Sequence, residues 1–199
     1  FEVAPQQHSQ KLLPFVDELL AESEIKLNQL DGIVFGQGPG SFTGVRIGVA
    51  ITQGLAFGAD LPTVGVSSLA TMAQQAIEQI QAERVVAAID ARMSEVYLGH
   101  FQNQQGLAVP VESETVIKPE LIQEQNLSSA YAVGTGWQTY QQILTDKLMC
   151  KSSEIVLPNA LYMLPLGLEL FKQGKTVSAE HAQPNYVRDE VSWKKLPGR

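Results

Sequence analysis

The stretch best placed to do chemistry is Gly36-Gln37-Gly38-Pro39-Gly40-Ser41-Phe42-Thr43-Gly44, which joins a short apolar run to a helical pattern. A glycine-rich turn that opens a helix can bind phosphate, because the first N–H groups of the helix lack partners. The candidate anion contacts are Gly38, Gly40, Ser41 and Thr43. The alternative is a structural turn, with a serine or threonine hydroxyl capping the helix.

Known phosphate-binding motifs fit this stretch poorly. A Walker A loop requires lysine and then serine or threonine after its last glycine, whereas Val45 and Arg46 follow Gly44 here. The dinucleotide fingerprint is only approximated, and Pro39 removes one backbone donor. We therefore favour the structural turn and expect no cofactor to be bound by this chain alone.

Other residues that could do chemistry do not form a catalytic set. Asp90 and Glu95 flank a turn and could act as an acid and a base, but Arg92 between them favours an ion pair that stabilises the turn. The three histidines at positions 8, 100 and 181 lack a second ligand at helical zinc-site spacing, so we expect no metal site. The single cysteine, Cys150, excludes an internal disulfide and is typical of a reducing cytoplasm.

The elements that must position these residues alternate in type. Apolar patterns predict a helix over 8–23, a strand over 33–35 and a helix from Ser41 or Thr43 to residue 58. They then predict a strand over 63–66 and a helix over 67–79 that is capped by Ser67 or Ser68. Alternating strands and helices are typical of an α/β fold with parallel strands.

A hairpin then interrupts the alternation, with strands over 84–90 and 95–101. We expect a third antiparallel strand over 109–117, a short helix over 119–125, a strand over 130–133 and a helix over 137–147. A closing apolar helix over 159–173 and a strand-like piece over 185–187 complete the pattern.

A hairpin followed by alternating helices and strands opens each lobe of an RNase H-like or actin-like fold. We therefore predict a two-lobed α/β fold of this type, with an N-terminal lobe over 1–80 and a C-terminal lobe over 81–199. The closing helix near 159–173 can pack back on the first lobe. The first lobe would need a matching hairpin before Phe1, and we infer that this hairpin has been lost, cleaved or left out of this sequence.

Composition is ordinary for a globular protein, with 44% hydrophobic and 18% charged residues among 199. The formal net charge of -7 argues against a chain that binds nucleic acid by itself, because phosphate contacts need clustered lysine and arginine. The last segment is locally basic, with Arg188, Lys194, Lys195 and Arg199. No apolar run approaches the roughly 20 residues that cross a bilayer, so we expect no membrane association.

The first two predicted helices have more apolar and small surface than one sheet can cover. The expected interface residues are Leu12, Val16 and Leu20 on the first helix, and Gly44, Arg46, Gly48, Val49 and Gln53 on the second. Glycine inside a helix costs about 1 kcal/mol relative to alanine, so several glycines in one helix need a reason. Close approach of another helix supplies one, and the pair predicts docking to a partner or to a copy of the chain.

Several motifs in one order resemble the bacterial TsaB (YeaZ) family over the whole chain. They are His8-Ser9-Gln10-Lys11-Leu12-Leu13-Pro14, Gly38-Pro39-Gly40-Ser41-Phe42-Thr43-Gly44-Val45-Arg46, Ala88-Ile89-Asp90-Ala91-Arg92-Met93-Ser94-Glu95-Val96-Tyr97, Val133-Gly134-Thr135-Gly136-Trp137 and Pro184-Asn185-Tyr186-Val187-Arg188. Members of the family open with a strand hairpin containing an Asp-Thr-Ser/Ala-Thr turn, to which nothing here corresponds.

The resemblance implies an actin-like (ASKHA) fold and a cytoplasmic role in forming N6-threonylcarbamoyladenosine at position 37 of tRNAs. It implies a non-catalytic subunit that docks through its first two helices onto the catalytic paralogue TsaD and activates it, with the ATPase TsaE as a further partner. ATP and metal are expected on those partners, tRNA contact only through the complex, and a homodimer when the chain is alone.

The alternative is a stand-alone peptidase or ATPase of the actin-like fold. The family carries an old glycoprotease label, but the metal site of TsaD has a His-x-x-x-His pair. Residues 9 to 12 after His8 are Ser, Gln, Lys and Leu, so that pair is missing here.

Overall fold

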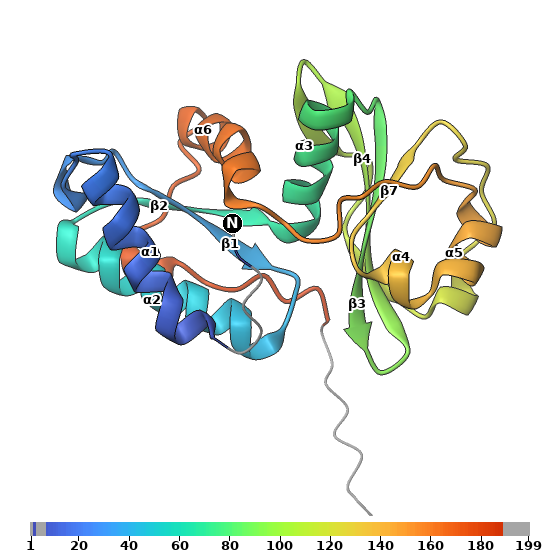
Figure 1. Cartoon of the computed structure of the whole chain (residues 1–199), viewed down its shortest axis with the longest axis horizontal. Coiled ribbons are helices and arrows are strands. Elements are labelled where there is room, and N and C mark those ends of the chain that lie inside the picture. Colours follow the sequence, from blue (N-terminus) through green and yellow to red (C-terminus); the bar gives the residue numbers. More distant parts are fainter. Residues whose placement is uncertain (1, 3–6, 189–199) are drawn as a thin grey trace, which may run out of the picture.

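The computed structural model of the chain describes residue 2 and residues 7–188, which form two lobes with a β-sheet in each (Figure 1). Helix α3 (Ser68–Ile80) follows the first sheet directly and packs on the second. Ser67 caps it, because its hydroxyl accepts from the backbone N–H groups of Leu69 and Ala70 at 3.1 and 3.2 Å. The predicted two-lobed α/β fold is confirmed.

The first sheet contains two parallel strands, β1 (Ile33–Gly38) and β2 (Thr63–Ser67), joined by helix α2 (Phe42–Ala59). Phe35 of β1 packs against Val49 of α2. Val34 points to the opposite face because side chains alternate along a strand. On that face lie the 3-10 turn η3 (Ala160–Met163) and helix α6 (Leu164–Lys172). Within the described residues, the outer edge of β1 pairs with no strand.

Close contact between α6 and β1 depends on a glycine of the helix. A Cβ atom added to Gly167 would lie 2.5 Å from a methyl carbon of Val34, so only glycine allows this approach. The helix predicted over 159–173 begins as a 3-10 turn and becomes α-helical at Leu164. Pro165 lies in the first turn of the α-helical part.

The second sheet is built on the predicted hairpin of β3 (Arg84–Arg92) and β4 (Glu95–Gln104). Strand β7 (Tyr131–Val133) runs parallel to β3 on its other side. Val85 and Ala87 face α3, whereas Val86 and Ala88 belong to the cluster on the opposite face. This alternation explains why β3 is apolar at successive positions, since both of its faces are covered.

Several predicted boundaries in the second lobe were wrong. The strand expected over 109–117 is two short strands, β5 (Leu107–Pro110) and β6 (Thr115–Ile117), which pair separately with β4. Pro110, which has no N–H to donate, ends the first of them. The helix expected over 119–125 is a single 3-10 turn, η2 (Pro119–Leu121).

The helix expected over 137–147 is also interrupted. Tyr140 leaves helical geometry with φ -123° and ψ 34°, which divides it into α4 (Gly136–Thr139) and α5 (Gln141–Leu148). Trp137 anchors α4 because its indole N–H donates to the carbonyl oxygen of Val86 at 3.1 Å. These two helices cover the face of the second sheet opposite α3 (Figure 1).

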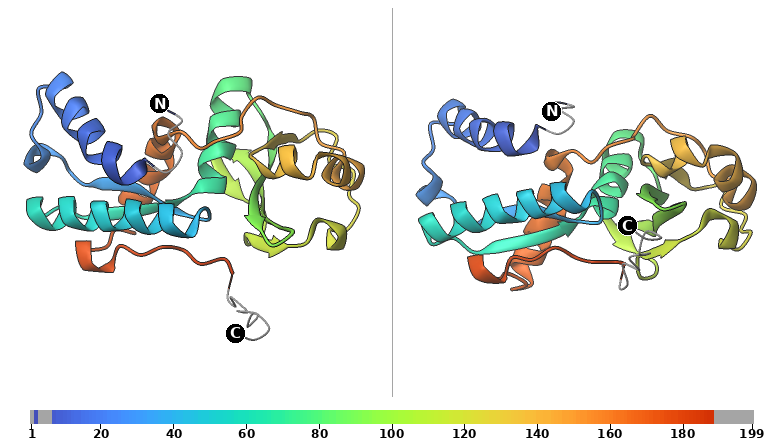
Figure 2. Two further views of the ribbon diagram at one scale, coloured as in Figure 1. Left: turned by 60° about the horizontal axis from the view of Figure 1, so that its bottom comes forward. Right: turned by 90° about the horizontal axis from the view of Figure 1, so that it is seen from below.

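The first lobe also contains α1 (His8–Glu22), which lies beside α2, and the 3-10 turn η1 (Leu27–Gln29). After α6 the chain forms the 3-10 turn η4 (Ala179–His181) and runs back along α2 (Figure 2). The piece over 185–187, expected to be strand-like, is not a strand. Lys194, Lys195 and Arg199 of the predicted basic segment lie outside the described residues.

Candidate functional site

The glycine turn forms one wall of a cavity between the lobes. Gly38 has φ +96°, which favours glycine, and the Ser41 hydroxyl caps α2 by accepting from the backbone N–H of Gly44 at 3.4 Å. The structural-turn interpretation is thus confirmed for Ser41. Of the four candidate anion contacts, Gly40 and Ser41 line the cavity. An anion-binding role for Gly38, Gly40, Ser41 and Thr43 stays a prediction.

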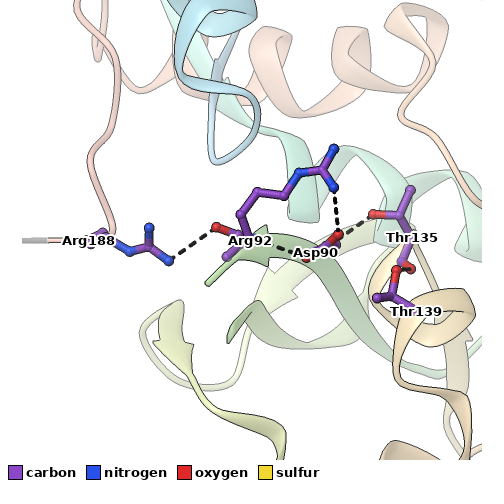
Figure 3. Close-up of polar contacts among 6 residues, drawn as sticks. Asp90, Arg92, Thr135, Thr139 and Arg188 are labelled. Atoms are coloured by element: carbon purple, nitrogen blue, oxygen red, sulfur yellow. Dashed lines mark hydrogen bonds and ion pairs between the residues drawn. The ribbon is translucent and has the colours of Figure 1, made fainter. Parts of the chain in front are cut away.

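The hairpin turn of the second lobe forms the facing wall. Asp90 accepts from the backbone N–H of Arg92 at 2.9 Å, and its carboxylate lies 3.6 Å from the Arg92 guanidinium (Figure 3). The Thr135 hydroxyl accepts from the backbone N–H of Asp90 at 3.1 Å. The predicted ion pair at this turn is therefore present.

Glu95 does not share this pair, because its carboxylate binds Arg188 at 2.6 Å. The sequence analysis missed this contact, which joins residues 93 positions apart. Each of the two carboxylates of the hairpin is thus paired with its own arginine.

The cavity between these walls has a volume of about 910 Å³. Phe42 and Arg46 line it from the first lobe, Asp90 and Arg92 from the second, and residues 184–188 border both. A volume of this order is that of a small-molecule site.

The remaining candidates for chemistry are poorly placed for it. Burial raises the pKa of the Cys150 thiol to about 12, so the thiol stays protonated and is a weak nucleophile. Within residues 7–188, no three His, Cys, Asp or Glu side chains lie together in a way that could hold a metal ion.

Helix α1 is poorly covered by the rest of the first lobe. None of its side chains from Ser9 to Glu22 is buried, although the helix carries several leucines. Leu12, Val16 and Leu20 are half-buried, whereas Leu19 has 62% of its surface exposed. A leucine-rich helix that buries none of its side chains from Ser9 to Glu22 has apolar surface to offer to another molecule.

Helix α2 has one buried face and one exposed stripe. Its exposed positions Thr43, Arg46, Ala50, Gly54 and Phe57 recur at spacings of three and four, which places them on one side of the helix. Phe57 has 79% of its surface exposed, and its place in this spacing was a signal that the sequence analysis did not use.

Three of the glycines in α2 do not approach another part of the described chain. A Cβ atom added to Gly48, Gly54 or Gly58 would have no atom within 4 Å. Close packing within the chain therefore does not explain Gly48 and Gly54, and they remain available to an external helix. Gly44 is half-buried.

Two residues predicted for the interface point into the chain instead. Val49 is only 4% exposed and packs with Phe35 and Ala182, so its assignment to the interface was wrong. The Gln53 side chain donates to the carbonyl oxygen of Ala182 at 2.8 Å, so its amide is bound within the chain. Arg46 is exposed, stacks 3.6 Å over the Phe42 ring and donates to the Tyr186 hydroxyl at 3.0 Å.

No helix among residues 7–188 combines the length and the apolar character that crossing a membrane would require.

Comparison with known proteins agrees with this architecture. Residues 2–195 match the family model described as TsaD, tRNA N6-adenosine threonylcarbamoyltransferase. The chain is 48% identical to the tRNA threonylcarbamoyladenosine biosynthesis protein TsaB of Escherichia coli, over 100% of this chain and 88% of that protein. It is 49% identical to the TsaB protein of Haemophilus influenzae, over 100% of this chain and 87% of that protein.

A solved structure shows the same fold at high similarity. It is an uncharacterised Pseudomonas aeruginosa protein described as similar to the peptidase YeaZ, with a TM-score of 0.87 and 43% identity. The match covers 94% of this chain and 87% of that one. Together with the two-lobed actin-like fold, these matches show that the chain belongs to the TsaB (YeaZ) family of the TsaD-like proteins.

Proposed function

We propose that this chain is a non-catalytic subunit in the biosynthesis of N6-threonylcarbamoyladenosine at position 37 of tRNAs. In this proposal it docks through α1 and α2 onto the paralogous threonylcarbamoyltransferase TsaD and activates it. Its relatives are named for this biosynthesis, and its family model is named for the transferase. The partners TsaD and TsaE supply the ATP and metal chemistry, and tRNA meets this chain only in the complex.

The observation that carries the proposal is the uncovered apolar surface of α1 and α2. Leu19 of α1 and Phe57 of α2 are large apolar side chains with most of their surface exposed, and none of the side chains from Ser9 to Glu22 is buried. Gly48 and Gly54 face open space, so a partner helix can approach the α2 backbone there. Exposed apolar surface of this kind is typical of a protein interface.

The relation between the two proteins favours pairing through the same elements. Because this chain and the transferase share one family model, a related helix pair is expected on the partner. Two such pairs can meet about an approximate twofold axis, as in an isologous interface. Another copy of this chain offers the same surface, which supports a homodimer when the transferase is absent.

The non-catalytic part of the proposal is supported by the contacts of the side chains that could take part in a reaction. Asp90 and Glu95 are paired with arginines, and the Cys150 thiol stays protonated. These contacts stabilise the fold rather than leave groups free to react.

Co-purification tests the proposal. A tagged chain co-expressed with TsaD is expected to elute as one complex from size-exclusion chromatography. A Leu19→Asp variant is expected to lose the complex yet keep its circular dichroism spectrum, because Leu19 lies mostly in solvent. The matched control is Leu121→Asp, a similarly exposed leucine of the second lobe, which should still pair. Normal pairing of a folded Leu19→Asp variant would rule out α1 as part of the interface.

A further inference from the structure

The final described segment, residues 182–188, connects the two lobes and is here called the clasp; it is the red segment that leaves η4 in Figure 2. Its first residue, Ala182, is fully buried with Phe35 and Val49. The carbonyl oxygen of Ala182 accepts from the Gln53 side-chain amide at 2.8 Å. The clasp therefore begins firmly attached to α2.

The middle of the clasp is held by the end of β1 and the first turn of α2. The backbone N–H of Asn185 donates to the carbonyl oxygen of Gln37 at 2.8 Å. The Tyr186 hydroxyl accepts from Nε of Arg46 at 3.0 Å. Both partners belong to the first lobe, so the clasp remains on that lobe as far as Tyr186.

The last described residue, Arg188, reaches the second lobe. Its guanidinium donates to the Glu95 carboxylate at 2.6 Å and to the carbonyl oxygen of Ala91 at 3.2 Å; Figure 3 shows Arg188 facing the hairpin turn. The side chains of Arg188 and Glu95 are only 17% and 27% exposed. An ion pair shielded from water to this degree is worth more than an exposed one, because screening is weaker.

The cavity lies between the parts of the two lobes that the clasp joins. Its walls include Phe42 at the start of α2 and Arg92 at the hairpin turn, and Arg188 itself lines it. A change in the distance between the clasp's two attachment points would therefore open or close the cavity.

We propose that residues 182–188 act as an interlobe lock, in which the Arg188–Glu95 ion pair fixes the separation of the lobes and thus the opening of the cavity. The motif Pro184-Asn185-Tyr186-Val187-Arg188 has its role here. Breaking the ion pair leaves the clasp attached to the first lobe and removes its hold on the hairpin turn of the second lobe, which can then move relative to it.

Distance measurement by electron paramagnetic resonance tests the lock in the full chain. Cys150 is replaced by serine, and spin labels are placed at two exposed positions, Glu22→Cys in the first lobe and Gln141→Cys in the second. We expect one narrow distance distribution, which broadens and lengthens when Arg188→Ala is added. The swapped pair of Glu95→Arg with Arg188→Glu should restore the narrow distribution. Arg84→Ala, an exposed arginine outside the clasp, is the matched control and should leave it narrow.

Hydrogen exchange provides a second readout. Because the clasp should stay attached to the first lobe, the Asn185 amide, which donates to Gln37, should exchange at the same rate in Arg188→Ala as in the original chain. Glu95→Gln keeps the shape of the acceptor without its charge and should broaden the distance distribution less than Arg188→Ala does. An unchanged distance distribution in Arg188→Ala would overturn the proposal, as would an equal change in Arg84→Ala or faster exchange of the Asn185 amide in Arg188→Ala.

Discussion

The exposed ring of Phe57 offers the sharpest test of the docking surface. A phenylalanine buries roughly 150–250 Å² in a protein interior, so covering the exposed four-fifths of this ring would remove on the order of 150 Å² from water, worth about 4 kcal/mol. Only part of such a transfer free energy contributes to the binding free energy, because binding also orders side chains. Replacing Phe57 by alanine should therefore weaken binding to TsaD by about 2 kcal/mol, or roughly thirtyfold in Kd.

Titration calorimetry with purified TsaD measures this change directly. The isolated Phe57→Ala variant should unfold at the same urea concentration as the original chain or slightly above it, because the ring touches little of its own protein and alanine favours helix. Leu121→Ala serves as the control and should bind with the original Kd. Unchanged affinity in a folded Phe57→Ala variant, or equal weakening by Leu121→Ala, would refute the reasoning.

Three further predictions concern stability and pH. Gly54→Ala should stabilise the isolated chain by about 1 kcal/mol in urea unfolding, because alanine favours a helix and its Cβ atom would meet open space there. The same variant should bind TsaD more weakly. A destabilised variant would contradict this prediction. Gly134→Ala should instead destabilise the fold by about 3 kcal/mol. Gly134 has φ +102°, and a Cβ atom there would lie 2.2 Å from the carbonyl oxygen of Ala88. An unchanged midpoint of urea unfolding would disprove this prediction. Burial lowers the pKa of His100 below 6.5 and outweighs the opposing effect of Glu112, so the folded chain binds fewer protons there than the unfolded chain. The free energy of unfolding should therefore fall as pH drops from 7 through 6.5 towards 5, and less steeply in His100→Gln; equal slopes in urea titrations at these pH values would contradict this.

Local patterns were sufficient to predict much of the fold. The Ser67 cap and the hairpin of β3 and β4 follow from short-range signals that lie within a few residues of each other. The break at Tyr140 could not be read in this way, because no proline or glycine marks it and packing on the second sheet decides it. Helix boundaries depend on such tertiary contacts more than the existence of helices does.

The exposed face of α2 was predicted only in part, for a geometric reason. The spacing of Arg46, Val49 and Gln53 defines a line along α2, but the sequence alone does not say which face rests on the sheet. Phe35 of β1 sets that face, which places Val49 in the core. The contact between Arg188 and Glu95 could not be predicted, because these residues are 93 positions apart in sequence and meet only through the arrangement of the two lobes.

Reconstituted tRNA modification tests the central claim most directly. TsaD, TsaE, ATP, a threonylcarbamoyl donor and unmodified tRNA are combined with increasing amounts of this chain, and threonylcarbamoyladenosine is measured. The account predicts that product formation depends on the chain and saturates at an equal amount of TsaD, and that the chain alone neither hydrolyses ATP nor cleaves peptides. Full modification without the chain would contradict it. So would hydrolysis by the chain alone that disappears in Asp90→Asn or Glu95→Gln.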